Sequence, residues 1–126
     1  MHLSMHNWMR AEPLETTIQR LAKYGYKSIE IGAETGKYKT KEVRRLLKDN
    51  KLRCWGAISL MFTGLDLIQA DKEGREKTVQ YLKDSVTFVK ELDGEVMSIV
   101  PSEVGKVRAQ ADPKTEWKWA VQGLKE

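Results

Sequence analysis

This chain contains little cysteine and little histidine, and both shortages exclude classes of site. Cys54 is the single cysteine among 126 residues, so no disulfide can form within the chain. It lies in an apolar segment, where we expect a buried, unreactive thiol rather than a nucleophile. No cysteines or histidines have the spacing of a zinc site, and there is no glycine-rich phosphate loop or nucleophile elbow. The sequence therefore contains no complete catalytic motif.

Long hydrophobic runs are also absent. No segment approaches the roughly 18 apolar residues of a membrane-spanning helix, so we expect no membrane insertion. Residues 1–6 lack both the basic region and the continuous apolar region of a secretory signal, and we expect a cytoplasmic protein. The composition, 40% hydrophobic and 32% charged over 126 residues, is ordinary for a soluble protein of one domain at most.

Four short apolar runs are each followed by an amphipathic helical pattern. The runs are residues 3–9, 28–31, 53–59 and 95–100. This alternation predicts a parallel α/β architecture, and a (β/α)8 TIM barrel closes only with eight strands. We therefore expect residues 1–126 to be a single region that supplies about four β/α units, the N-terminal half of such a barrel. The other half would come from a longer chain, a second copy or another polypeptide.

The apolar spacing also predicts which side of each helix faces the core. The first helix should begin near Pro13 and end at Gly25, a residue suited to a left-handed cap. Residues 60–70 are too irregular for either periodicity and predict a loop. The core-facing positions that we expect are Leu14, Ile18, Leu21 and Ala22, then Val43, Leu46 and Leu47, then Val79, Leu82, Val86, Val89 and Leu92, and finally Trp117, Ala120, Val121 and Leu124.

Basic residues are concentrated in residues 37–53. Eight basic residues and two acidic residues give this stretch a net charge of +6, whereas the remainder of the chain carries −2. Such a patch is able to hold phosphates or nucleic acid. The alternative is a solvated helix face, because Val43, Leu46 and Leu47 form an apolar stripe and the basic residues fall mostly off it.

Polar and aromatic side chains lie at the ends of the predicted strands that would open onto the barrel mouth, where barrel active sites form. If Ile29 and Ile31 face the helices, strand alternation turns Glu30 into the barrel. This set is able to recognise a polyol, with an indole stacking on a sugar face and hydroxyl groups meeting carboxylates and serines. The candidate substrate-binding residues are His6, Trp8, Glu30, Ser59 and Ser102, with Glu34 and Glu103 nearby.

Each candidate also has a structural alternative. His6 and Trp8 are equally suited to packing in the barrel wall, and Glu34 to a solvated loop. Ser102 is suited to capping a turn.

Two segments carry a family resemblance. Residues 18–32, IQRLAKYGYKSIEIG, resemble the early helix and second strand of the xylose-isomerase-like barrels, a superfamily of sugar phosphate isomerases and epimerases that also contains the endonuclease IV type enzymes. Gly25, Tyr26 and Glu30 match the family pattern of a helix ending in glycine and an aromatic residue before a strand with a glutamate. Residues 100–119, VPSEVGKVRAQADPKTEWKW, resemble members that act on sugars, including the large subunits of bacterial C-glycoside-cleaving enzymes.

The resemblance implies a divalent metal, commonly manganese, held by residues on later strands and so not by this chain. It also implies removal of a proton next to the carbonyl of a sugar or 3-oxo-glycoside, which leads to isomerisation, epimerisation or C-glycoside cleavage. We expect a small sugar as substrate and assembly as a homo-oligomer or with a second subunit.

Two other functions remain open. One is a half-barrel that binds or assembles without chemistry of its own and buries its open sheet edges in a partner. The other is a DNA-repair enzyme like endonuclease IV. Such nucleases place zinc-binding histidines on early strands, and residues 28–31 and 53–59 contain none. We therefore do not expect nucleic acid as a partner.

Overall fold

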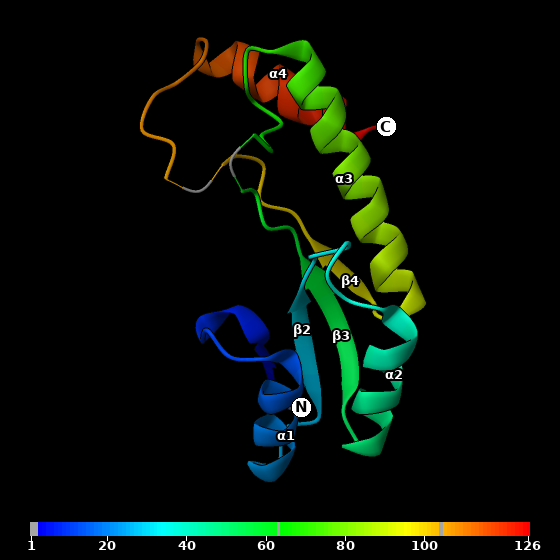
Figure 1. Cartoon of the computed structure of the whole chain (residues 1–126). Coiled ribbons are helices and arrows are strands. Elements are labelled where there is room, and N and C mark those ends of the chain that lie inside the picture. The colour runs from blue at the N-terminus through cyan, green and yellow to red at the C-terminus, as the bar shows by residue number, and fades with distance from the viewer. Residues whose placement is uncertain (1–2, 63, 104) are drawn as a thin grey trace. The chain divides into compact units, whose positions relative to one another are not determined.

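The computed structural model describes residues 3–62, 64–103 and 105–126. Four strands form one parallel sheet in the order β1-β2-β3-β4 (Figure 1). The strands are β1 (Ser4–His6), β2 (Ser28–Gly32), β3 (Arg53–Ile58) and β4 (Val96–Ser98). Strand order equals chain order, with a helix after each strand, as the alternation of apolar runs and helical patterns predicts.

Four α-helices alternate with the strands. They are α1 (Leu14–Lys23), α2 (Thr40–Asp49), α3 (Lys72–Glu91) and α4 (Pro113–Leu124), and a short 3-10 helix covers Asn7–Met9. Asp112 caps α4, because its carboxylate accepts bonds from the backbone N–H groups of Lys114 and Thr115. Gly25 ends α1 with φ +78°, which confirms the left-handed cap. None of the helices in the described ranges is long and apolar enough to cross a membrane.

The chain divides into two compact units. The sheet unit comprises residues 3–59 and 85–98 and contains the four strands, α1, α2 and the last residues of α3. The helical unit comprises residues 60–84 and 99–126 and contains the rest of α3, α4 and the loops before them.

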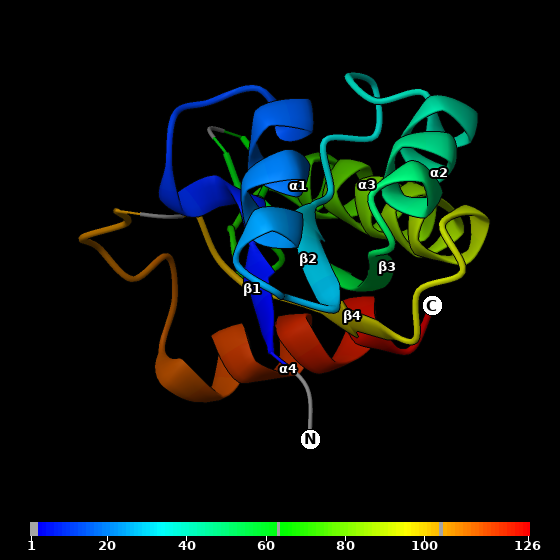
Figure 2. The ribbon, with the colours of Figure 1, turned by 90° about the horizontal axis from the view of Figure 1, so that it is seen from below.

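The core of the sheet unit lies on one face of the sheet. Ile29 and Ile31 of β2 are fully buried, and α1 and α2 lie along the same side of the strands (Figure 2). Burying each such side chain contributes about 1.5–3 kcal/mol. The helical residues in this core are Leu14, Ile18 and Leu21 of α1, Val43 and Leu47 of α2, and Phe88 and Val89 of α3.

Strand β3 contains one more residue than its pairing with β2 requires. Ile29 is opposite Cys54 and Glu30 is opposite Gly56, so Trp55 is an extra residue at a β-bulge. A side chain at position 56 would collide with the Val96 carbonyl of β4, so glycine permits the pairing of β3 with β4. The bulge and the glycine together fix the register at the centre of the sheet.

The first and fourth strands are markedly shorter than the sequence predicts. The run 3–9 is a strand only to His6, and a 3-10 turn follows, so Trp8 does not lie on a strand. At the start of this turn, the Asn7 side chain accepts a bond from the backbone N–H of Gly32 at 2.8 Å. The fourth strand ends at Ser98, which pairs with Ile58, the last residue of β3.

The expected core faces of two helices were partly wrong. Val79, Leu82, Val89 and Leu92 are buried, but Val86 is 52% exposed. The buried line runs through Ser85 instead, at spacings of three and four from its neighbours. In α4, Ala120 is buried, whereas Trp117 and Leu124 are exposed.

Packing within the helical unit explains why Ala120 of α4 is buried and Trp117 is exposed. The buried side of α4 is centred between Ala120 and Gly123, and a Cβ added at Gly123 would lie 2.8 Å from the Leu67 side chain. Nearby, the Arg75 guanidinium lies 4.6 Å from the centroid of the Trp119 ring, a cation–π contact. The small residues therefore face the loop and α3, and Trp117 is turned towards solvent.

Candidate functional site

Glu30 lies on the face of the sheet opposite the helices. Its neighbours Ile29 and Ile31 are buried in the core, while Glu30 itself is half-buried, as strand alternation predicts. Its carboxylate oxygen Oε1 accepts a hydrogen bond from the Ser98 hydroxyl at 3.0 Å. Among the described residues, no bond is made to the second oxygen, Oε2. A carboxylate is thus held in place with an acceptor atom available.

His6 lies beside Glu30. The two residues are register partners on β1 and β2, so their side chains share one face of the sheet. The His6 imidazole stacks on the Trp8 indole, with ring centroids 4.3 Å apart and planes 19° apart. Its Nδ1 atom is buried and has no hydrogen-bond partner in the described chain, while Trp8 is 51% exposed. An unpaired buried nitrogen is costly, so this atom is a candidate for a ligand contact.

The two serines lie in different units. Ser59 is buried directly after β3, and its backbone N–H donates to the Ser98 carbonyl at 2.9 Å. Ser59 and Glu30 thus each bond to Ser98, Ser59 through its backbone N–H and Glu30 through its carboxylate. Ser102 belongs to the helical unit, where its hydroxyl donates to the Asp66 carboxylate at 3.2 Å.

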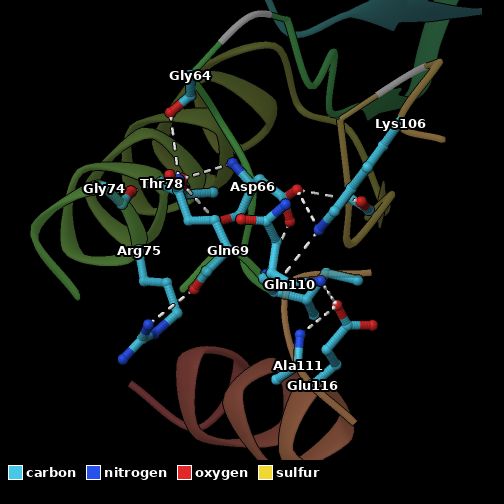
Figure 3. A network of polar contacts seen from close by, with 12 residues as sticks. Gly64, Asp66, Gln69, Gly74, Arg75, Thr78, Lys106, Gln110, Ala111 and Glu116 are labelled. Carbon is cyan, nitrogen blue, oxygen red and sulfur yellow. Dashed lines mark hydrogen bonds and ion pairs between the residues drawn. The ribbon is translucent and has the colours of Figure 1, made fainter. Parts of the chain in front are cut away.

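Asp66 is the centre of a polar network that sequence reasoning missed (Figure 3). This carboxylate is 4% exposed. Its Oδ2 accepts bonds from Lys106 Nζ at 2.8 Å and from Ser102, and its Oδ1 accepts from the Ile68 N–H at 2.8 Å. The Thr78 hydroxyl accepts from the Asp66 N–H at 2.9 Å. One feature of the sequence could have indicated a buried carboxylate here, because Asp66 is the single charged residue in the stretch GLDLI.

Three bonds to one buried carboxylate, from Lys106, Ser102 and the Ile68 N–H, satisfy the rule that buried charges are paired and hydrogen-bonded. They join residues 66–68, Ser102 and Lys106, so the loop after β4 is fixed to the loop before α3 within the helical unit. The residues around Ser102 and Lys106 line a cavity of about 490 Å³.

A second polar group lies in the loops after β1 and β2. The Glu34 carboxylate accepts bonds from Lys37 Nζ at 3.0 Å and from the Tyr38 hydroxyl at 3.3 Å, so Glu34 is not a purely solvated loop charge. The bond to Glu34 raises the pKa of Lys37, and burial raises the pKa of Tyr38. These residues and Trp8 line a cavity of about 380 Å³.

The described residues do not form a metal site. Within residues 3–62, 64–103 and 105–126, no three histidine, cysteine or acidic side chains lie close enough together to hold an ion. Glu30 has a serine partner rather than a second carboxylate. Cys54 fits the expectation of an unreactive thiol, because burial raises its pKa to about 11.

A family model described as xylose isomerase-like TIM barrel matches residues 18–126. The matched region includes β2, β3, β4 and three of the four α-helices in full. No curated protein sequence matches the chain.

Solved structures of sugar epimerases share the fold. D-psicose 3-epimerase from Clostridium cellulolyticum H10 is similar over 98% of this chain and 46% of that chain, with a TM-score of 0.83 and 17% identity. D-allulose 3-epimerase from Methylomonas sp. is similar over 98% and 45%, with a TM-score of 0.83 and 19% identity. The 3-keto-D-glucoside 4-epimerase YcjR from E. coli is similar over 99% and 49%, with a TM-score of 0.69 and 16% identity. The chain therefore spans about half the length of these structures.

Proposed function

Because this chain belongs to the xylose isomerase-like TIM barrel family, we propose that it supplies the first four β/α units of a sugar isomerase or epimerase. The complete enzyme removes a proton from the carbon next to the carbonyl of a sugar or of a 3-oxo-glycoside. Return of a proton to a different face or carbon gives epimerisation or isomerisation, and loss of an aglycone gives C-glycoside cleavage. The structural similarity to ketose epimerases and to a 3-keto-glucoside epimerase supports a sugar substrate.

The observation that carries the proposal is the Glu30 carboxylate on the open face of the sheet, fixed by Ser98 and beside His6. Glu30 Oε2 accepts hydrogen bonds from substrate hydroxyls, since Oε1 is already bonded. The exposed indole of Trp8 packs against the apolar face of a sugar ring, and His6 Nδ1 bonds to a substrate oxygen. Ser59 of the sheet unit and, separately, Ser102 of the helical unit are further proposed substrate-binding residues.

The proposal includes a divalent metal, manganese by family resemblance, in the complete enzyme. Such an ion stabilises negative charge on the substrate oxygen during proton removal. The described residues provide no site for it, so their proposed roles are confined to substrate binding and orientation.

Exchange of substrate hydrogen with solvent tests the proposal. The complete protein with manganese would be incubated in D2O with D-psicose, D-tagatose, D-fructose or a 3-keto-D-glucoside. We expect deuterium to enter next to the carbonyl of at least one of these sugars, as measured by mass spectrometry. Identification of the product by NMR then distinguishes an epimer, an isomer and a released aglycone.

A matched pair of variants locates the reaction at the proposed site. Glu30→Gln should slow exchange, whereas Glu15→Gln, at an exposed position of α1, should not. A folded, metal-loaded protein that exchanges none of the four sugars would contradict the proposed function.

A further inference from the structure

A basic cavity of about 540 Å³ lies beside the start of β3, within the sheet unit. Its floor is apolar, formed by Leu47, Leu52, Cys54 and Leu92. Its rim is charged, with Arg44, Arg45 and Lys48 from α2, Arg53 from the first position of β3, and Asp93. We call this cavity the basic pocket. It lies at the amino end of β3, whereas Glu30 is in the middle of β2 and Ser59 follows the carboxyl end of β3.

The carboxylates around the basic pocket neutralise only half of its cations. Arg44 pairs with Asp93 at 2.5 Å, and Arg53 pairs with Glu95. In the part of the chain that the structure describes, Arg45 and Lys48 pair with no carboxylate. The Arg45 guanidinium and the Lys48 ammonium, three positions apart on α2, thus leave the basic pocket with a net charge of +2.

The ends of the adjacent helices explain only one of these two cations. Both α2 and α3 end in a left-handed residue, Lys51 and Asp93, each with φ 56°. The last carbonyls are satisfied by backbone bonds, from Leu52 N to Leu47 O at 3.0 Å and from Gly94 N to Val89 O at 2.9 Å. The negative end of a helix dipole favours cations only in the last turn, which accounts for Lys48 but not for Arg45.

We propose that the basic pocket binds a phosphate group carried by a small molecule. The Arg45 guanidinium and the Lys48 ammonium contact the phosphate, because arginine binds phosphate oxygens through two parallel N–H donors and lysine as a point charge. Arg44 and Arg53 are held at the rim by their carboxylate partners, so their charges are already neutralised. The apolar floor reduces water access and so strengthens these charge interactions.

The size of the cavity favours one small ligand over a nucleic acid. A volume of about 540 Å³ falls within the range of roughly 300–1,000 Å³ for small-molecule sites. Binding to a duplex relies on several phosphate contacts spread along the backbone, and only two cations here lack a partner. The basic pocket is separate from the proposed substrate site, so binding of phosphate in the pocket does not depend on the proposed reaction.

Calorimetric titration of the full chain with pyrophosphate tests the proposal. We expect saturable binding with one site per chain. Arg45→Ala/Lys48→Ala should weaken binding at least about tenfold, because it removes both charged groups that contact the phosphate. Lys39→Ala/Lys41→Ala is the control, since it removes the same charge from the start of the same helix, outside the pocket.

Thermal unfolding shows that each variant is folded before binding is compared. Weak, non-saturating binding of pyrophosphate would overturn the proposal, as would an equal loss in both double variants. A DNA duplex provides a second arm of the test. Tighter binding of the duplex than of pyrophosphate, reduced equally in both variants, would indicate an extended basic surface and would also overturn it.

Discussion

Ser98 on β4 donates a hydrogen bond to Glu30 on β2, although β3 lies between the two strands. The register partner of Glu30 on β3 is Gly56, which has no side chain to separate the two groups. Glu30 is therefore oriented by a residue 68 positions further along the chain.

Replacing this carboxylate tests its role in substrate binding. In the complete enzyme, Glu30→Gln should preserve the fold but lower kcat/KM by about five- to tenfold, because a charged hydrogen bond of roughly 1.5–3 kcal/mol becomes a neutral one of roughly 0.5–1.5 kcal/mol. Steady-state kinetics and the melting temperature would be measured on the same variant. A lower melting temperature with unchanged kinetics would make Glu30 a purely structural residue.

The side of α3 that faces the core can be tested with two apolar positions. Leu82 is 5% exposed and Val86 is 52% exposed. Leu82→Ala should lower the free energy of unfolding by about 2–5 kcal/mol, whereas Val86→Ala should change it by less than about 0.5 kcal/mol. Urea titrations would measure both, and equal losses would show that the orientation of the helix is wrong.

Breaking the ion pair of Asp66 and Lys106 should be costly. Lys106→Met leaves a buried carboxylate without its cation, which typically costs about 3–5 kcal/mol. Asp66→Asn in the same chain removes the unpaired charge and should restore part of the stability. A double-mutant cycle measured in urea gives the coupling, and strictly additive losses would contradict a direct interaction.

Cys54 should be unreactive in the folded protein. Its pKa of about 11 leaves on the order of one thiolate in a thousand at pH 8, and the side chain is 3% exposed. A chromogenic disulfide reagent at pH 8 should react slowly with the native chain and rapidly in 8 M urea, ~100-fold or more apart on these grounds. Rapid reaction without denaturant would show that the thiol is accessible.

Local patterns in the sequence predicted the parts of the structure that depend on local physics. The alternation of Ile29, Glu30 and Ile31 correctly placed two side chains in the core and one on the opposite face. Gly25 was correctly predicted as a left-handed cap. Helical spacing predicted the buried side of α3 less well. Ser85 and Val86 are both three or four residues from buried neighbours, and hydrophobicity alone favours the valine, although the serine is the buried residue.

The features that the sequence did not predict depend on contacts between residues far apart in the chain. The first strand ends where Asn7 bonds to Gly32, 25 residues away. The partner of Asp66, Lys106, is 40 residues away, and no periodicity connects them. The substrate-binding roles of His6, Trp8, Glu30, Ser59 and Ser102 remain predictions.

The extra residue in β3 determines where this strand tolerates a change in length. Before the bulge, Cys54 faces the helices with Ile29; after it, Gly56 faces the open side with Glu30. Removing Trp55 alone would join two segments that already pair correctly with β2. Removing Ala57, by contrast, would move Ile58 into its place and exchange the inner and outer side chains of everything that follows. This chain should therefore keep the same two faces of the sheet when one residue is lost at position 55.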